Sequence, residues 1–173
     1  MKGLITYSSK TGNTKKLAEK IYDRLKNNFD IELKALDDVN FKDLEKYSYI
    51  LHGFWTRMTK IDNKSKKFLS KIGKDKIVGL FGTSGGEHLS EHGQRLHNDI
   101  KSELDKLNSI GCKMTLGKVN PDMLSKMDGI IGNLVPKKMK EYIKEMAEKS
   151  REATDEERNE VAEFFENKLK EIL

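Results

Sequence analysis

The sequence predicts an α/β fold with a doubly wound, five-stranded parallel sheet. Three observations lead to this prediction. Short segments of strand character alternate with segments of helical periodicity from the first residues onward. Five strands separated by helices are typical of a parallel sheet that helices cover on both faces. The chain also has 173 residues, the length of one domain, so we expect residues 1–173 to form a single domain.

Five segments have the character of strands. The first is a short apolar run that ends at Ser8 and Ser9, and the fourth is apolar apart from Gly79. The second and fifth alternate apolar and polar residues, as half-buried strands do. The predicted strands are 4–7, 31–35, 49–54, 77–81 and 112–119.

Helical periodicity separates these strands and ends the chain. Apolar residues recur at helical spacing in 17–25, 61–72 and 96–107, with charged residues between them. A final helix follows the capping box Thr154-Asp155-Glu156-Glu157. Residues 120–153 form a helical insertion before that helix: Asn120-Pro121 has the pattern of a helix start, and a second helix is expected near Pro136.

The predicted strand order of the sheet is 2-1-3-4-5. In doubly wound folds a ligand binds outside the carboxyl ends of the strands, at the point where the strand order reverses. That point lies between the first and third strands. The loops after the first, third and fourth strands are therefore the candidate ligand site.

The loop after the first strand has the composition of a phosphate site. It consists of Ser9, Lys10, Thr11, Gly12, Asn13 and Thr14, and it leads into a helix. A helix N-terminus offers unpaired N–H groups to an anion, three hydroxyl groups add donors, and Gly12 allows close backbone approach. The alternative is an ordinary capped turn. The loop lacks the spacing of a nucleotide-binding P-loop and of a dinucleotide-binding glycine motif.

The stretch Ser9-x-Thr11-Gly12-Asn13-Thr14, preceded by Tyr7 and Ser8, resembles the phosphate-binding signature of the flavodoxin family. The resemblance extends over residues 1–119 and more loosely over the final helix. It implies that this loop binds the phosphate of FMN.

The loop after the third strand contains the single tryptophan of the chain. Trp55 at a ligand-facing strand end can stack on a flat ring, and the alternative is a tryptophan that packs in the core. The flavodoxin resemblance implies that this loop supplies a stacking aromatic residue and a backbone carbonyl to the flavin. The predicted binding residues are Gly53, Phe54, Trp55 and Thr56.

The loop after the fourth strand is rich in glycine and hydroxyl groups, which allows a tight wrap with exposed backbone donors. By resemblance, Thr83, Ser84, Gly85 and Gly86 hold the pyrimidine edge of the flavin. The family pattern continues with an acid and a tyrosine that covers the outer flavin face. This sequence has neither at that spacing; His88 is a candidate substitute, and the alternative is a solvent-facing loop histidine.

Other residue types argue against several classes of function. Cys112 is the single cysteine, so no internal disulfide can form, and it is expected to be a small buried hydrophobe. The four histidines show no metal-ligand spacing, and no catalytic triad or carboxylate pair is evident. No nucleic-acid motif is present. The first apolar run is too short for a signal peptide and no segment suits a membrane span, which predicts a cytoplasmic protein.

We weigh three functions. The first is an FMN-binding electron carrier that serves a partner oxidoreductase. The net charge of +5 and the lysines between Lys60 and Lys76 favour a partner with an acidic docking surface, although a solvated helix face, with Lys60, Lys64, Lys67 and Lys71 in one stripe, explains the run equally well. In the first interpretation, the positive charge also eases reduction of the flavin.

The second function is a flavin-dependent oxidoreductase or a subunit of one. The loop Gly53-Phe54-Trp55-Thr56 and the stretch 82–85 resemble the flavodoxin-like accessory subunit associated with bilirubin reductase. The basic character and the C-terminal extension resemble the flavodoxin-like, menaquinone-dependent protoporphyrinogen oxidases. These resemblances imply a tetrapyrrole or quinone substrate. The third function is a flavin-free binding module.

Overall fold

The computed structural model describes residues 1–57, 59–86, 91–119 and 136–173. Its sheet runs in the order β2-β1-β3-β5-β6, and a two-residue strand, β4, pairs with β3 off this path. The five main strands pair in parallel, so their order along the chain is 2-1-3-4-5, as predicted. The strands are β1 (Gly3–Tyr7), β2 (Ile31–Ala35), β3 (Tyr49–Arg57), β4 (Lys60–Ile61), β5 (Ile77–Ser84) and β6 (Asn108–Leu116).

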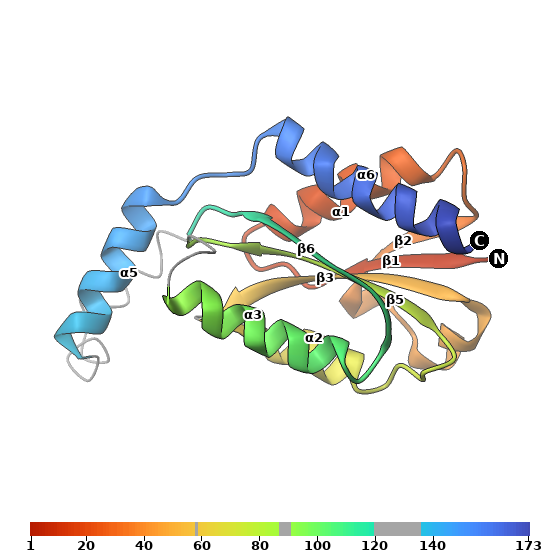
Figure 1. Cartoon of the computed structure of the whole chain (residues 1–173), viewed down its shortest axis with the longest axis horizontal. Coiled ribbons are helices and arrows are strands. Elements are labelled where there is room, and N and C mark those ends of the chain that lie inside the picture. The colour runs from red at the N-terminus through yellow and green to blue at the C-terminus, as the bar shows by residue number, and fades with distance from the viewer. Residues whose placement is uncertain (58, 87–90, 120–135) are drawn as a thin grey trace.

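Helices cover both faces of this sheet (Figure 1). One face carries α1 and α6, the other carries α2 and α3, and α5 extends past the edge where the parallel strands end. The α-helices are α1 (Asn13–Leu25), α2 (Asn63–Leu69), α3 (Glu91–Leu104), α5 (Lys137–Lys149) and α6 (Asp155–Ile172). Two 3-10 helices, η1 (Leu36–Asp38) and η2 (Phe41–Lys46), connect β2 to β3.

Two hydrophobic cores follow from the alternation of side chains along the strands. Ile50 and Phe54 of β3 pack with Phe68 of α2 on one face of the sheet. Leu51, between them in the sequence, packs with Phe165 of α6 on the other face. Both faces are therefore buried, as a parallel sheet requires.

The segment after β3 differs from the prediction. Ile61, expected in a helix, belongs to β4, which forms an antiparallel ribbon with the end of β3. That pairing also lengthens β3 to Arg57. The helix begins only after Asp62, whose side chain accepts a hydrogen bond from Ser65 N–H at 3.0 Å. A cross-strand pair and a cap therefore determine this boundary, rather than apolar spacing.

The last strand begins four residues earlier than predicted, at Asn108 instead of Cys112. The register of β6 against β5 shifts between Val78 and Gly79, and Gly111 in β6 has a φ of +109°. A bulge with a glycine at positive φ interrupts the alternation of side chains. The sequence pattern therefore detects only the part of the strand that follows the bulge.

The C-terminal region contains the predicted helix before α6. The capping box is present: Glu157 N–H donates to the Thr154 hydroxyl, and the Glu157 carboxylate accepts from Thr154 N–H at 2.8 Å. Helix α5 begins directly after Pro136, also as predicted. The expected helix start at Asn120-Pro121 lies outside the described residues. No helix of the described part has the length and apolar character that crossing a bilayer requires.

Candidate functional site

The three loops chosen from the sequence meet at the carboxyl edge of the sheet. Tyr7 at the end of β1 is in register with Gly53 of β3, and Trp55 of β3 is in register with Thr83 of β5. The loop that leaves β1 is joined to β3 by a hydrogen bond from Ser8 N–H to the Gly53 carbonyl at 2.8 Å. Parallel pairing therefore brings together residues that lie far apart in the chain.

The first loop leaves the N-terminus of α1 open to a ligand. Gly12 is the N-cap residue, and its φ of +90° is a conformation that glycine adopts without a steric penalty. A glycine carries no side chain to cap the first turn. Ser9 and Thr11 lie beside this turn, half-buried and exposed respectively. Lys15 N–H donates to the Ser9 hydroxyl at 3.3 Å. The loop thus combines the helix N–H groups that precede Lys15 with accessible hydroxyls, which suits an anion.

Two predicted phosphate-loop residues have side chains that join the loops. The Thr14 side chain is almost fully buried; its hydroxyl lies 3.0 Å from the Thr83 hydroxyl and 3.4 Å from the Phe54 carbonyl oxygen. The Asn13 amide donates to Thr11 Oγ1 and to the Lys118 carbonyl, each at 3.0 Å. These contacts position the loop, while Ser9, Lys10 and Thr11 remain at its surface.

The second loop presents one aromatic ring at the edge. Phe54 is fully buried in the core, so only its backbone faces the site. Trp55 is half-buried, and the Lys10 Nζ atom lies 5.4 Å from the centre of its ring. The Thr56 hydroxyl donates to the Thr83 carbonyl at 3.3 Å and so joins the second loop to the third. Trp55 is the ring that remains available for stacking.

The sequence pattern did not single out Asp62, whose side chain makes hydrogen bonds that position this loop. Its carboxylate is 2 % exposed and accepts hydrogen bonds from the hydroxyls of Ser8 at 3.1 Å and Ser65 at 2.7 Å. It also accepts from the backbone N–H of Trp55 at 3.4 Å. A buried charge is tolerated when hydrogen bonds satisfy it. The stretch Asp62-Asn63-Lys64-Ser65 is an N-cap motif and is the one indication of this role that the sequence carries.

The third loop packs closely against the end of β6. Gly117 N–H donates to the Ser84 carbonyl at 2.9 Å. A Cβ atom at Gly85 would lie 2.3 Å from Cγ2 of Val119, so a larger residue here would displace that side chain. Thr83 and Ser84 are buried, whereas Gly85 and Gly86 are half-buried at the edge. His88, the candidate substitute for the family's tyrosine, lies outside the described residues.

Two titratable side chains, one in β3 and one in β6, lie at the hydrophobic core rather than at the candidate site. His52 of β3 is fully buried; both ring nitrogens have no hydrogen-bond partner among the described residues, and its ring lies 4.7 Å from that of Phe68. Burial lowers the pKa of His52 to about 3, so the ring is neutral at pH 7. Cys112 is half-buried rather than fully buried as expected; it packs against the same core, and burial raises the pKa of its thiol to about 12.

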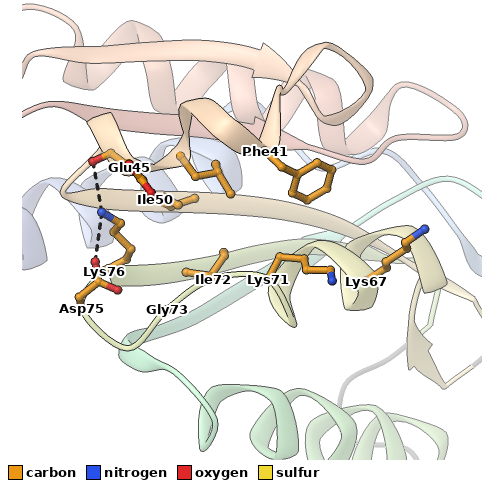
Figure 2. Close-up of a pocket in the computed structure, with 10 residues that line it drawn as sticks. Phe41, Glu45, Ile50, Lys67, Lys71, Ile72, Gly73, Asp75 and Lys76 are labelled. Atoms are coloured by element: carbon orange, nitrogen blue, oxygen red, sulfur yellow. Dashed lines mark hydrogen bonds and ion pairs between the residues drawn. The ribbon is translucent and has the colours of Figure 1, made fainter.

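An open pocket of about 670 Å³ lies away from these loops (Figure 2). Its walls come from η2, the start of β3, α2 and the segment between α2 and β5, and these segments meet near the amino edge of the sheet. Lys67 and Lys71 lie along one side of it, opposite Phe41. The pocket is therefore separate from the candidate site.

The structure also separates the lysines between Lys60 and Lys76. Lys60 belongs to β4 and Lys71 follows the end of α2, so the expected stripe on one helix is wrong. The reason is that α2 has only seven residues. Several lysines of this run form ion pairs with described acids: Lys64 with Asp37, Lys66 with Asp99 and Glu103, and Lys76 with Asp75.

Comparison with known proteins gives a consistent result. The sequence model of the family described as "Flavodoxin domain" matches residues 4–166. The flavodoxin-like domain-containing protein BilS of Clostridioides difficile (strain CD3) is 37 % identical over 128 residues, which are 73 % of this chain and 72 % of that protein.

Solved structures share the fold. A flavodoxin from Streptococcus pneumoniae TIGR4 superimposes with a TM-score of 0.64 at 14 % identity, and the match covers 99 % of this chain and 100 % of that one. The two-electron reduced flavodoxin of Megasphaera elsdenii gives a TM-score of 0.51 at 25 % identity, over 69 % of this chain and 89 % of that one.

Proposed function

This chain belongs to the flavodoxin family, and on that premise we propose that it binds one FMN at the carboxyl edge of its sheet and passes electrons to a partner oxidoreductase. One observation carries the proposal. The first turn of α1 and the carboxyl ends of β3 and β5 are joined through the Thr14–Thr83 and Thr56–Thr83 hydrogen bonds, beside the helix N-terminus at Gly12 and a half-buried Trp55. An anion site and a flat stacking surface lie next to each other there.

The residues present fit FMN. The N–H groups that follow Gly12 and the hydroxyls of Ser9 and Thr11 suit a phosphate monoester, because they offer several donors without a cluster of cations. Trp55 offers a ring face beside this turn. The backbone of Gly53–Thr56 and the residues Thr83–Gly86 supply polar groups for the remaining edges of the ligand.

These residues indicate what FMN and the protein would each contribute. FMN supplies the redox chemistry when bound, and the protein supplies binding, orientation and electrostatics. The Asp62 network fixes the backbone at Trp55, and the Thr14 hydroxyl fixes the phosphate loop against β3 and β5. The absence of a catalytic pattern in the sequence favours a carrier over an enzyme with its own substrate site.

The test is an FMN titration followed by quenching of FMN fluorescence. We expect the wild-type protein to bind FMN with a micromolar or lower Kd. Thr11→Asp places a carboxylate beside the negatively charged phosphate and retains an oxygen that accepts from the Asn13 amide. Because the two anions repel each other, we expect the affinity for FMN to fall at least about tenfold. Ser102→Asp makes a comparable change on an exposed position of α3 and serves as the control, with unchanged affinity.

Riboflavin, which lacks the phosphate, provides a second control. We expect it to bind more weakly than FMN and to be insensitive to Thr11→Asp. A folded wild-type protein that does not bind FMN at micromolar concentration would contradict the proposal. So would a Thr11→Asp variant that binds FMN as tightly as wild type. Dithionite reduction and air oxidation of the loaded protein, followed by absorbance, test the redox role.

A further inference from the structure

Four cationic residues lie on the segments that border the proposed FMN site, and we refer to them as the cationic rim: Lys10, Arg57, Lys60 and Lys118. All four are exposed. They lie on the loop after β1, the β3–β4 ribbon and the segment after β6, so they come from three separate parts of the chain.

Contacts of the described residues place the rim at the site itself. The Lys10 ammonium lies 5.4 Å from the centre of the Trp55 ring, within the range of a cation–π interaction. The Lys118 carbonyl accepts the Asn13 amide, which places Lys118 beside the phosphate loop. Arg57 is only two residues beyond Trp55 on the same strand.

The positions of Arg57 and Lys60 lower the stability of the folded chain. They are direct partners in the antiparallel pair of β3 and β4. Like charges that face each other across two strands are destabilising. No acidic partner compensates either of them among the described residues, where neither forms an ion pair. A role outside the folded chain would account for keeping this pair.

The rim differs from the other lysines of the chain. Lys64, Lys66 and Lys76 each have an acidic partner. Rim residues have no ion pair with any described acid. Glu152, whose pKa is lowered chiefly by Lys16 and also by Lys118, has its ion pair with Lys16 at 2.7 Å. The positive charge of the rim is therefore available to a second molecule.

We propose that the cationic rim is the docking surface for an acidic redox partner protein, which binds over the open edge of the FMN site. The proposal rests on the proposed function and moves the expected docking surface from the Lys60–Lys76 run to residues around Trp55. Complementary charge accelerates encounter and orients the partner with its redox centre toward the site. A partner with a cluster of surface carboxylates has charge complementary to the cationic rim, whereas a basic partner does not.

Two triple variants with the same net charge test the proposal. The rim variant carries Arg57→Gln, Lys60→Gln and Lys118→Gln, and it retains Lys10 because that residue belongs to the predicted FMN loop. The distant variant carries Lys67→Gln, Lys71→Gln and Lys101→Gln, which are exposed residues of the segments that lead to the amino edge of the sheet. Each variant has a formal charge of +2, three less than the +5 of the wild type.

The probes are two small haem proteins of opposite surface charge, acidic cytochrome b5 and basic cytochrome c. Stopped-flow absorbance measures the rate constant with which the reduced, FMN-loaded protein reduces each probe at increasing ionic strength. For wild type and cytochrome b5 we expect the rate constant to fall about tenfold as salt rises from low to high concentration. In the rim variant we expect about a tenfold lower rate constant at low salt and little salt dependence, whereas the distant variant stays within about twofold of wild type.

Equal losses in the two triple variants would overturn the proposal, because net charge rather than the rim would then be responsible. A rate constant with cytochrome b5 that rises with ionic strength, or one with cytochrome c that falls with it, would overturn it as well. FMN affinity of the rim variant, measured separately, is expected to equal that of wild type. If the wild-type protein binds no FMN, the proposed function fails, and the docking surface is still tested by calorimetric titration of the FMN-free protein with cytochrome b5.

Discussion

At the scale of single residues, the candidate site depends on buried groups that join its segments to one another. Asp62 joins Ser8, Ser65 and the Trp55 backbone in one network, and the Thr14 hydroxyl joins the start of α1 to β3 and β5. Both side chains are almost fully buried, so neither is exposed to a ligand. Their contribution is to hold Trp55 and the phosphate loop in one geometry, which lowers the cost of ordering them when a ligand binds.

Replacement of Asp62 by asparagine tests this network. Asparagine remains a good N-cap, so the change removes mainly the charge and one acceptor oxygen. We expect the free energy of unfolding to fall by about 1–3 kcal/mol, because buried donors lose a charged partner. Urea unfolding measures the change, and FMN affinity is expected to fall in parallel. Asp105→Asn, on an exposed residue, is the control, and an equal effect of the two substitutions would show that the network has no special role.

At the scale of elements, boundaries are set by caps and pairings rather than by hydrophobic spacing. Helix α2 has seven residues because β4 takes up Ile61 and Asp62 caps the helix start. Helix α6 begins at the capping box and is held against α1 by ion pairs, including Lys20 with Asp155 at 2.8 Å and Arg24 with Glu166 at 2.5 Å. These contacts orient the helix layer that covers the face opposite α2 and α3.

The capping box of α6 contributes to the free energy of unfolding by an amount that can be measured. Thr154→Ala removes the hydroxyl that accepts from Glu157 N–H, and we expect the free energy of unfolding to fall by about 1 kcal/mol. Thr154→Ser retains the hydroxyl and is expected to restore most of the loss. Thermal unfolding followed by circular dichroism distinguishes the two variants. If alanine and serine have the same effect, the cap does not stabilise the helix.

At the scale of the whole molecule, stability depends on keeping His52 neutral. The ring is fully enclosed, and its pKa falls from 6.5 to about 3. The unfolded chain therefore binds the proton more readily than the folded one does. The stability associated with neutral His52 is complete above pH 6.5 and is lost progressively as the pH falls from 6.5 toward 3.

His52→Leu tests this dependence. Leucine cannot take up a proton and leaves no unsatisfied nitrogen, so we expect the variant to be at least as stable as wild type at about pH 7.5. Between about pH 7.5 and 4.5 we expect it to lose about 2–3 kcal/mol less than wild type does. Urea unfolding across this pH range provides the measurement. Parallel stability curves for the two proteins would show that His52 does not control the acid sensitivity.

The order of the elements, and which loops meet, follows from the amino-acid sequence alone. Five strand segments separated by helices predict a parallel sheet, and a parallel sheet brings its carboxyl ends to one edge. The residue pattern alone therefore selects the Ser9–Thr14 loop, Trp55 and the Thr83–Gly86 loop as one site. The capping box at Thr154 is equally visible because its two hydrogen bonds connect residues three positions apart.

What each side chain does, in contrast, follows from the packing of the folded chain. Thr14 and Thr11 are similar in the sequence, yet pairing of β1, β3 and β5 buries the former and leaves the latter exposed. The spacing of residues in the sequence likewise does not predict that Lys10 lies over Trp55 or that Arg57 faces Lys60. These contacts arise from strand register and loop packing. Short-range patterns specify local elements, whereas burial and long-range neighbours depend on how those elements pack.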